Sequence, residues 1–253
     1  MKKRSRENFM TYLLPSALIA VFVLLCWGGF VWAGKTDLFK LNKINIYGNQ
    51  IVPKPELLAI IGDMPDDARL LDINLTKLQT RIEQHPYIAG ARLSRRFPHR
   101  LHLEVIERKP IAMVNNKQLV LLDKDGIVLP VPQQYEFQIP TLSGFNPDVG
   151  LYPIGARVLS VRVKETVELL MKIRRFYPGL YDELSEITLN QDDEFTLILT
   201  NNPTLINLGN SALIKRIITL MAFNSALQGK KTLTDFAYLD LRYAKQIIAR
   251  EWS

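Results

Sequence analysis

The chain has 253 residues, of which 47% are hydrophobic, and a formal net charge of +7. The composition is ordinary for a globular protein, and the length allows one or two modest domains with a sizeable core. The only cysteine is Cys26, which excludes a disulfide framework, so packing alone must stabilise the fold.

An uncharged apolar stretch covers residues 10–33 and predicts a transmembrane helix. As a helix at ~1.5 Å per residue it would reach ~36 Å, enough for a ~30 Å hydrocarbon core. The alternative is a cleaved signal peptide, because Val31 and Ala33 resemble a cleavage site, but apolar regions of signal peptides span only roughly 7–15 residues. Trp27 and Trp32 lie where an aromatic belt is expected.

Residues 1–9 carry four cations, Lys2, Lys3, Arg4 and Arg6, and one acid, Glu7. The positive-inside rule therefore predicts a cytoplasmic tail and places the remaining ~220 residues outside the cytoplasm. There the basic stretch 95–110 would meet no chromosome, so we expect no nucleic-acid partner.

After the apolar stretch, the pattern predicts β-α-α-β-β in about seventy residues. A strand at 41–47 ends in a Gly48-Asn49 turn, and a short helix at 56–61 follows Pro55 and stops at Gly62. A second helix has Leu75, Leu78 and Ile82 at helical spacing, Asp72 or Asn74 as its cap, and Pro86 beyond its end. Strands at 88–95 and 100–107 follow, joined by Phe97, Pro98 and His99; Leu101, Leu103 and Val105 alternate with polar residues.

From Ile111 onward the pattern predicts a β-rich layer that carries helices. Strands are expected at 117–122 and 127–131 around an Asp125-Gly126 turn, at 186–190 and at 195–200, and residues 236–243 begin a final strand pair. Amphipathic helices are expected at 161–177 and at 211–226, the latter capped by Asn210 or Ser211.

We find no motif for catalysis, cofactor binding or metal binding, and therefore expect a protein that is not an enzyme. His85, His99 and His102 are close in sequence but fall at a helix end, in a turn and on a strand face, which pre-arranges no metal site. The DKDG stretch at 123–126 lacks the later ligands of a calcium loop and is interpreted as a turn.

Three segments resemble the FtsQ/DivIB family of bacterial cell-division proteins: LNKINIYGNQIVPKPEL (41–57), residues 70–112 with RRFPHRLHLEVIERKP, and AYLDLRY (237–243) followed by Trp252. The resemblance implies an α+β fold. Its parts would be a cytoplasmic tail at 1–9, a single N-terminal transmembrane helix at 10–33, a POTRA domain at 40–110 and a C-terminal β-domain at 111–253 with packed helices.

The resemblance also implies a role as a bitopic scaffold of the divisome. Such a protein links early division proteins to FtsB and FtsL, and through them to FtsW, FtsI and septal peptidoglycan synthesis. It would lie in the inner membrane at the division septum, with its bulk in the periplasm. The alternative is a POTRA-bearing export or envelope-assembly factor.

In the family, FtsB adds a strand to the terminal hairpin, which implies partner-binding roles for Arg242, Tyr243 and Trp252 in this chain. Tyr and Arg are frequent hot-spot residues. The alternative for both aromatic residues is packing in the core. Residues 244–246 lack the glycine expected in a tight turn, and the odd spacing of Tyr243 and Trp252 requires a turn or bulge between them.

Overall fold

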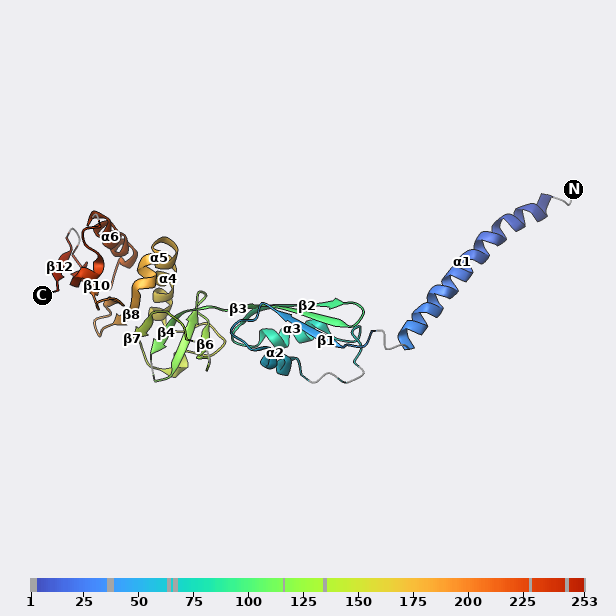
Figure 1. Cartoon of the computed structure of the whole chain (residues 1–253), viewed down its shortest axis with the longest axis horizontal. Helices are drawn as coiled ribbons and strands as arrows, with labels where there is room; N and C mark the ends of the chain where they lie inside the picture. The colour runs from blue at the N-terminus through green and yellow to red at the C-terminus, as the bar shows by residue number, and fades with distance from the viewer. Residues whose placement is uncertain are drawn as a thin grey trace.

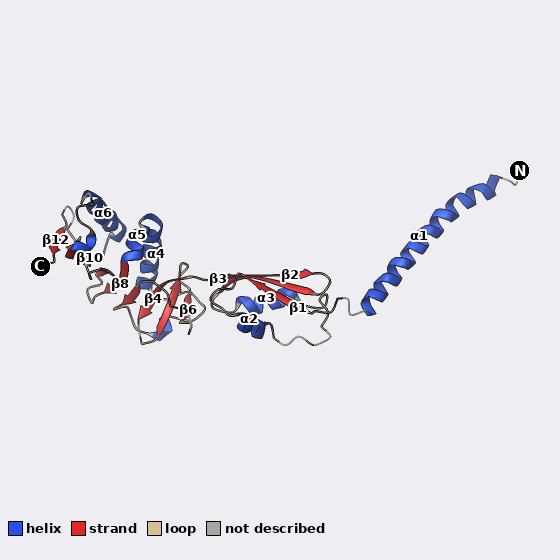
Figure 2. Ribbon diagram, in the orientation of Figure 1, coloured by secondary structure: helices blue, strands red, loops and turns tan. Residues whose placement is uncertain are grey.

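The computed structural model describes residues 4–35, 39–62, 65, 68–115, 117–133, 136–227, 229–243 and 246–252. Two sheets follow one another along the long axis of the molecule, each covered by helices, with the N-terminal helix at one end and the C-terminus at the other (Figures 1 and 2). The α+β class expected from the sequence is confirmed.

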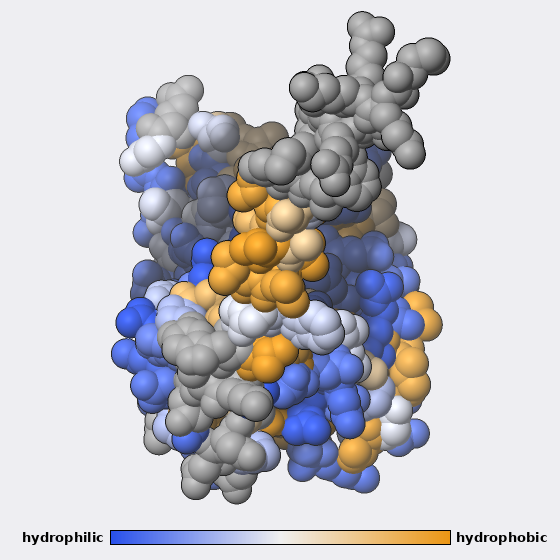
Figure 3. All heavy atoms as spheres, turned by 90° about the vertical axis from the view of Figure 1, so that its right-hand side faces the viewer, coloured by the Kyte–Doolittle hydropathy of each residue, from blue (hydrophilic) through white to orange (hydrophobic). Residues whose placement is uncertain are grey.

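Helix α1 (Arg4–Lys35) covers the predicted transmembrane stretch. Its apolar side chains gather in the foreground of Figure 3, and Leu18, Phe22 and Trp27 are each about two-thirds exposed. Among the residues that the structure describes, no helix meets the length and apolarity needed to cross a membrane. The transmembrane helix at 10–33 therefore stays a prediction.

The first module has the predicted β-α-α-β-β order. Its elements are β1 (Lys43–Tyr47), α2 (Lys54–Ile61), α3 (Leu75–Glu83), β2 (Ile88–Arg96) and β3 (Arg100–Glu107). The sheet order is β1-β3-β2, with β1 parallel and β2 antiparallel to β3. The alternating residues Leu101, Leu103 and Val105 are buried, as their spacing predicted.

Two turn signals in this module act as expected. Asn74 caps α3, because its side-chain oxygen accepts a hydrogen bond of 3.0 Å from the backbone N–H of Lys77. Gly48 has a φ of +85°, and a Cβ atom there would lie 2.1 Å from the carbonyl oxygen of Val105. Only glycine therefore fits this turn.

A carboxylate at the end of β3 holds the connection between β1 and α2. Glu107 accepts backbone N–H bonds from Gln50, Ile51 and Val52 at 2.8, 2.8 and 2.9 Å. These three donors lie just before α2. One side chain thus fixes the angle at which the chain enters that helix.

The second module is a nine-stranded mixed sheet in the order β12-β11-β10-β9-β8-β7-β4-β5-β6. In chain order its elements are β4 (Pro110–Asn115), β5 (Leu119–Asp123), β6 (Val128–Pro130), β7 (Thr141–Ser143), the 3-10 helix η2 (Val149–Leu151), α4 (Val161–Phe176), α5 (Pro178–Glu183), β8 (Leu184–Leu189), β9 (Phe195–Leu199), β10 (Leu205–Gly209), α6 (Leu213–Ala226), the 3-10 helix η3 (Leu233–Asp235), β11 (Phe236–Asp240) and β12 (Ile248–Glu251). The predicted β-rich layer with packed helices is confirmed.

Two local expectations in this module are wrong. Helix α6 begins at Leu213, and its N-cap is Ala212 with a φ of 51° and no side-chain cap, rather than Asn210 or Ser211. Two positive-φ residues, Gly209 and Ala212, turn the chain sharply after β10 and move the helix start. The strand expected at 236–243 ends at Asp240, because the Asp240 carboxylate accepts the backbone N–H of Arg242 and redirects the chain.

The two modules pack against each other. Only two residues separate β3 from β4, and Arg108 donates a hydrogen bond of 2.9 Å to the buried carboxylate of Asp123. The hydroxyl of Tyr87 donates to the carbonyl oxygen of Pro130 at 2.6 Å. Leu121 and Leu129 of the second module are buried in the apolar core of the first.

Candidate functional site at the terminal strand

Strand β12 is the outermost strand of the large sheet, paired on one side with β11. All four of its residues are exposed, and no strand among the described residues pairs with its other side. Such an edge presents unpaired backbone N–H and C=O groups to solvent. We call β12, the preceding segment Leu241–Tyr243 and the following Trp252 the C-terminal edge.

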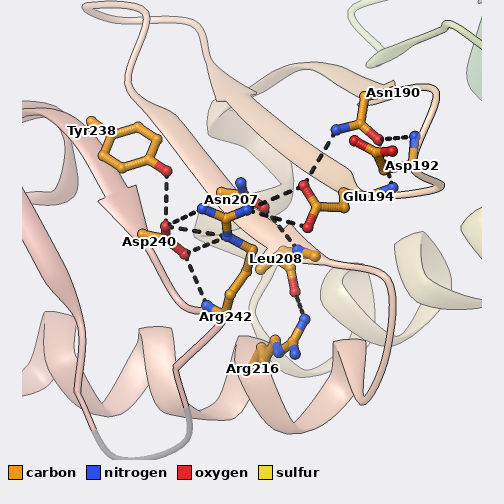
Figure 4. Close-up of polar contacts among 10 residues, drawn as sticks. Asn190, Asp192, Glu194, Asn207, Leu208, Arg216, Tyr238, Asp240 and Arg242 are labelled. Carbon is orange, nitrogen blue, oxygen red and sulfur yellow. Dashed lines mark hydrogen bonds and ion pairs between the residues drawn. The ribbon is translucent and has the colours of Figure 1, made fainter.

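Arg242 is held by carboxylates of its own chain (Figure 4). Its guanidinium donates to Asp240 from Nε at 3.1 and 3.2 Å and from Nη2 at 2.8 Å, and to both oxygens of Glu194 from Nη1 at 3.2 and 3.3 Å. The side chain is still 38% exposed. The predicted partner-binding arginine thus fixes the course of the chain after β11.

Asp240 is the buried centre of this network, with 3% of its surface exposed. It also accepts a hydrogen bond of 3.0 Å from the hydroxyl of Tyr238. The hydrogen bonds from Arg242 lower the pKa of the Asp240 carboxyl, while burial raises the pKa of Tyr238. The carboxylate is therefore ionised at neutral pH and pairs with the arginine.

Glu194 reaches the network from the turn before β9. The Asn190 side-chain oxygen accepts the backbone N–H groups of Asp192 and Glu194, both at 2.9 Å, which shapes this turn (Figure 4). Sequence reasoning missed Glu194 because it lies 48 positions from Arg242. The only signal in the sequence was Asn190, because Asn favours the short turns that connect neighbouring strands.

Tyr243 lies beside a groove between α6 and the segment that leads to β12. The groove has a volume of about 460 Å³, and Lys215, Thr219, Phe223 and Ile247 are among its lining residues. The Tyr243 side chain is 49% exposed, which contradicts the alternative that it packs in the core.

Trp252 lies at the opposite end of β12. Its indole N–H donates to the carbonyl oxygen of Thr234 at 3.2 Å, and the neighbouring Glu251 forms an ion pair with Lys231. Its side chain is 47% exposed, so packing in the core is wrong here as well. The chain reverses between Asp240 and Ile248, which resolves the odd spacing of the two aromatic residues; Ala244 and Lys245 lie outside the described residues.

The histidines lie in the first module, apart from this site, and two of the three have acidic neighbours. His85 and Glu56 are 3.1 Å apart, and His102 and Glu104 are 3.0 Å apart. The His102 ring also stacks on Tyr47, with ring centroids 4.5 Å apart. The structure brings no three potential metal ligands together among the residues it describes.

Comparison with known proteins assigns both modules to one family. Residues 39–108 match the family model for the FtsQ-type POTRA domain, and residues 109–250 match the FtsQ/DivIB C-terminal related model. The chain is similar to the cell division protein FtsQ of Geotalea daltonii (24% identity; 93% of this chain and 84% of the relative), of Geobacter sp. (25%; 89% and 81%) and of Anaeromyxobacter sp. (27%; 95% and 81%). The chain therefore belongs to the FtsQ/DivIB family of cell-division proteins.

Proposed function

We propose that this protein is a membrane-anchored, non-enzymatic scaffold of the divisome that binds FtsB at its C-terminal edge. Through FtsB and FtsL it would act on FtsW, FtsI and septal peptidoglycan synthesis. The observation that carries the proposal is β12, an exposed edge strand at the end of the large sheet. When a partner adds a strand to such an edge, the backbone hydrogen bonds provide affinity, and contacts of every second side chain provide specificity.

The proposed layout follows the boundaries expected from the sequence. Residues 1–9 would be cytoplasmic, residues 10–33 would span the inner membrane, and a POTRA domain at 40–110 and a β-domain at 111–253 would lie in the periplasm at the septum. The uncharged stretch 10–33 behind a basic tail supports this anchoring.

Within the C-terminal edge we assign different roles to the three predicted residues. Tyr243 would contact FtsB, because its ring is exposed beside the groove. Arg242 would act mainly by positioning Tyr243 through Asp240 and Glu194. Trp252 would both contact the partner and hold the end of β12 against Thr234.

A proline pair tests strand addition directly. In an antiparallel ladder, successive backbone N–H groups point to opposite sides, so of Ala249 and Arg250 one N–H faces β11 and the other faces the open edge. Proline removes that donor. We therefore make both Ala249→Pro and Arg250→Pro and keep the variant whose melting temperature equals that of the wild type, because its proline removes the N–H at the open edge. We expect this variant to lose binding to FtsB, as measured by calorimetry with the full chain in detergent. Wild-type affinity in that variant would rule out strand addition at β12.

Side-chain recognition is tested by Tyr243→Ala. We expect it to weaken FtsB binding by about 2 kcal/mol or more, as truncation of a hot-spot residue does, without lowering the melting temperature. Tyr47→Ala is the matched control, because Tyr47 is similarly exposed on the first module. Equal affinity of the Tyr243→Ala and Tyr47→Ala variants would remove Tyr243 from the interface.

A further inference from the structure

Three cations lie side by side on the open face of the three-stranded sheet. Lys43 of β1 and Arg96 of β2 both lie opposite Arg100 of β3 in the strand register, and all three residues are exposed. Like charges at directly opposite positions destabilise a sheet. None of the ion pairs formed among described residues involves these three cations, which we call the basic row.

An aromatic side chain extends the basic row at the β2–β3 turn. Phe97 is 58% exposed, and its ring makes an edge contact with Phe39, with centroids 5.8 Å apart. Cations beside an exposed apolar ring are the combination that favours the interface between lipid headgroups and acyl chains.

The basic row lies where the chain enters the first module. The backbone N–H of Asn42 donates to the carbonyl oxygen of His99 at 2.9 Å, and that of Lys43 donates to the same oxygen at 3.4 Å. Figure 1 shows this end of β1, β2 and β3 on the side from which the chain arrives after α1. From the end of α1 at Lys35 to Phe39, four extended residues reach at most about 14 Å.

We propose that the basic row and Phe97 dock on anionic phospholipid headgroups of the membrane that holds α1. The proposal rests on the anchoring proposed above, because that anchor would keep Phe39, which contacts Phe97, within about 14 Å of the end of α1. Each Lys or Arg near an anionic surface multiplies the ratio of docked to undocked molecules by roughly five. Docking would hold the first module at a fixed tilt and thereby set how far the C-terminal edge stands from the membrane.

The test uses the full chain in nanodiscs. A fluorophore is placed at Asn42→Cys in a Cys26→Ser background, and its quenching by nitroxide-labelled headgroups is compared between discs of phosphatidylcholine and discs with one third phosphatidylglycerol. A second label at Ile106→Cys reports the far end of the same sheet face, where Ile106 is 70% exposed.

We expect phosphatidylglycerol to increase quenching at position 42 and to leave position 106 unchanged. High salt should remove the increase, since charges beyond a Debye length are screened. Each of Lys43→Gln, Arg96→Gln and Arg100→Gln should lower the docked ratio about fivefold, whereas Arg92→Gln, on the same face outside the row, should not. The melting temperature of each variant shows whether the module is still folded.

Quenching at position 42 that is equal in both lipids, or unaffected by the three row variants, would overturn the docking proposal and leave the anchor intact. Failure of the chain to enter nanodiscs of either composition would instead overturn the proposed anchor, and with it the basis for docking.

Discussion

At the scale of single residues, the structure gives Arg242 and its neighbours a structural role at the end of β11. Asp240 is buried, is ionised and accepts hydrogen bonds from Arg242 and Tyr238. The segment Leu241–Tyr243 follows directly, so its position depends on this carboxylate. If the C-terminal edge binds FtsB as proposed, we expect stability and partner binding to be coupled there.

The Asp240→Asn variant tests this coupling through pH. Hydrogen bonds to charged groups contribute about 1.5–3 kcal/mol, so we expect a loss of about 2 kcal/mol in the free energy of unfolding at pH 7. Because the Asp240 pKa is lowered in the folded state, its contribution is fully present above the unfolded pKa of about 3.9 and is lost as pH falls through the folded value. Urea denaturation should thus show the wild type and the variant converging below about pH 4; a constant difference down to pH 2 would contradict the assignment.

Glu107 offers a second residue-level prediction, in the first module. Its carboxylate accepts three backbone N–H bonds, whereas the single oxygen of an amide cannot satisfy them all. We expect Glu107→Gln to lower the free energy of unfolding by about 2 kcal/mol, measured by urea denaturation. Glu104→Gln on the same strand is the control, because Glu104 is exposed and pairs with His102. Equal stability of the two variants would contradict the role of Glu107.

At the scale of elements, local patterns predicted most of the fold. The two amphipathic helices α4 and α6 and the β-α-α-β-β order of the first module follow from periodicity and from caps such as Asn74. Strands β4, β7 and β10 were missed, and each of them pairs in parallel with a strand far away in sequence. Such pairing depends on tertiary contacts that no short window contains.

In the candidate site too, local sequence and distant contacts contribute different parts. The resemblance selected Arg242, Tyr243 and Trp252 from a local motif. Their surroundings come from distant positions: Glu194 binds Arg242, and Thr234 accepts the Trp252 hydrogen bond. The partner-binding roles of these three residues stay predictions, and the contacts that position them could be found only in the structure.

At the scale of the whole molecule, the two modules share a packed junction. The first core includes Leu121 and Leu129 of the second module, and Tyr87 bonds across the junction to Pro130. A rigid junction would transmit the position of the first module to the C-terminal edge. We therefore expect the two modules to unfold as one cooperative unit.

Two tyrosines test that expectation. Tyr87→Phe removes the hydrogen bond across the junction, and Tyr181→Phe removes a bond of 2.8 Å to the carbonyl oxygen of Ile111 within the second module. Each change should cost about 1–2 kcal/mol by removing the tyrosine donor from a carbonyl that is partly buried at Pro130 and buried at Ile111. Hydrogen exchange should show both modules destabilised equally in both variants. A Tyr181→Phe effect confined to the second module would show that the modules unfold independently.

The central claim, that this protein is a division scaffold, is tested most directly by depleting it in its source bacterium and rescuing with fluorescent fusions. We predict filaments without septa, rescued by a wild-type fusion at midcell but not by the folded β12 proline variant that fails to bind FtsB. Cells of normal length with regular septa after depletion would contradict the account.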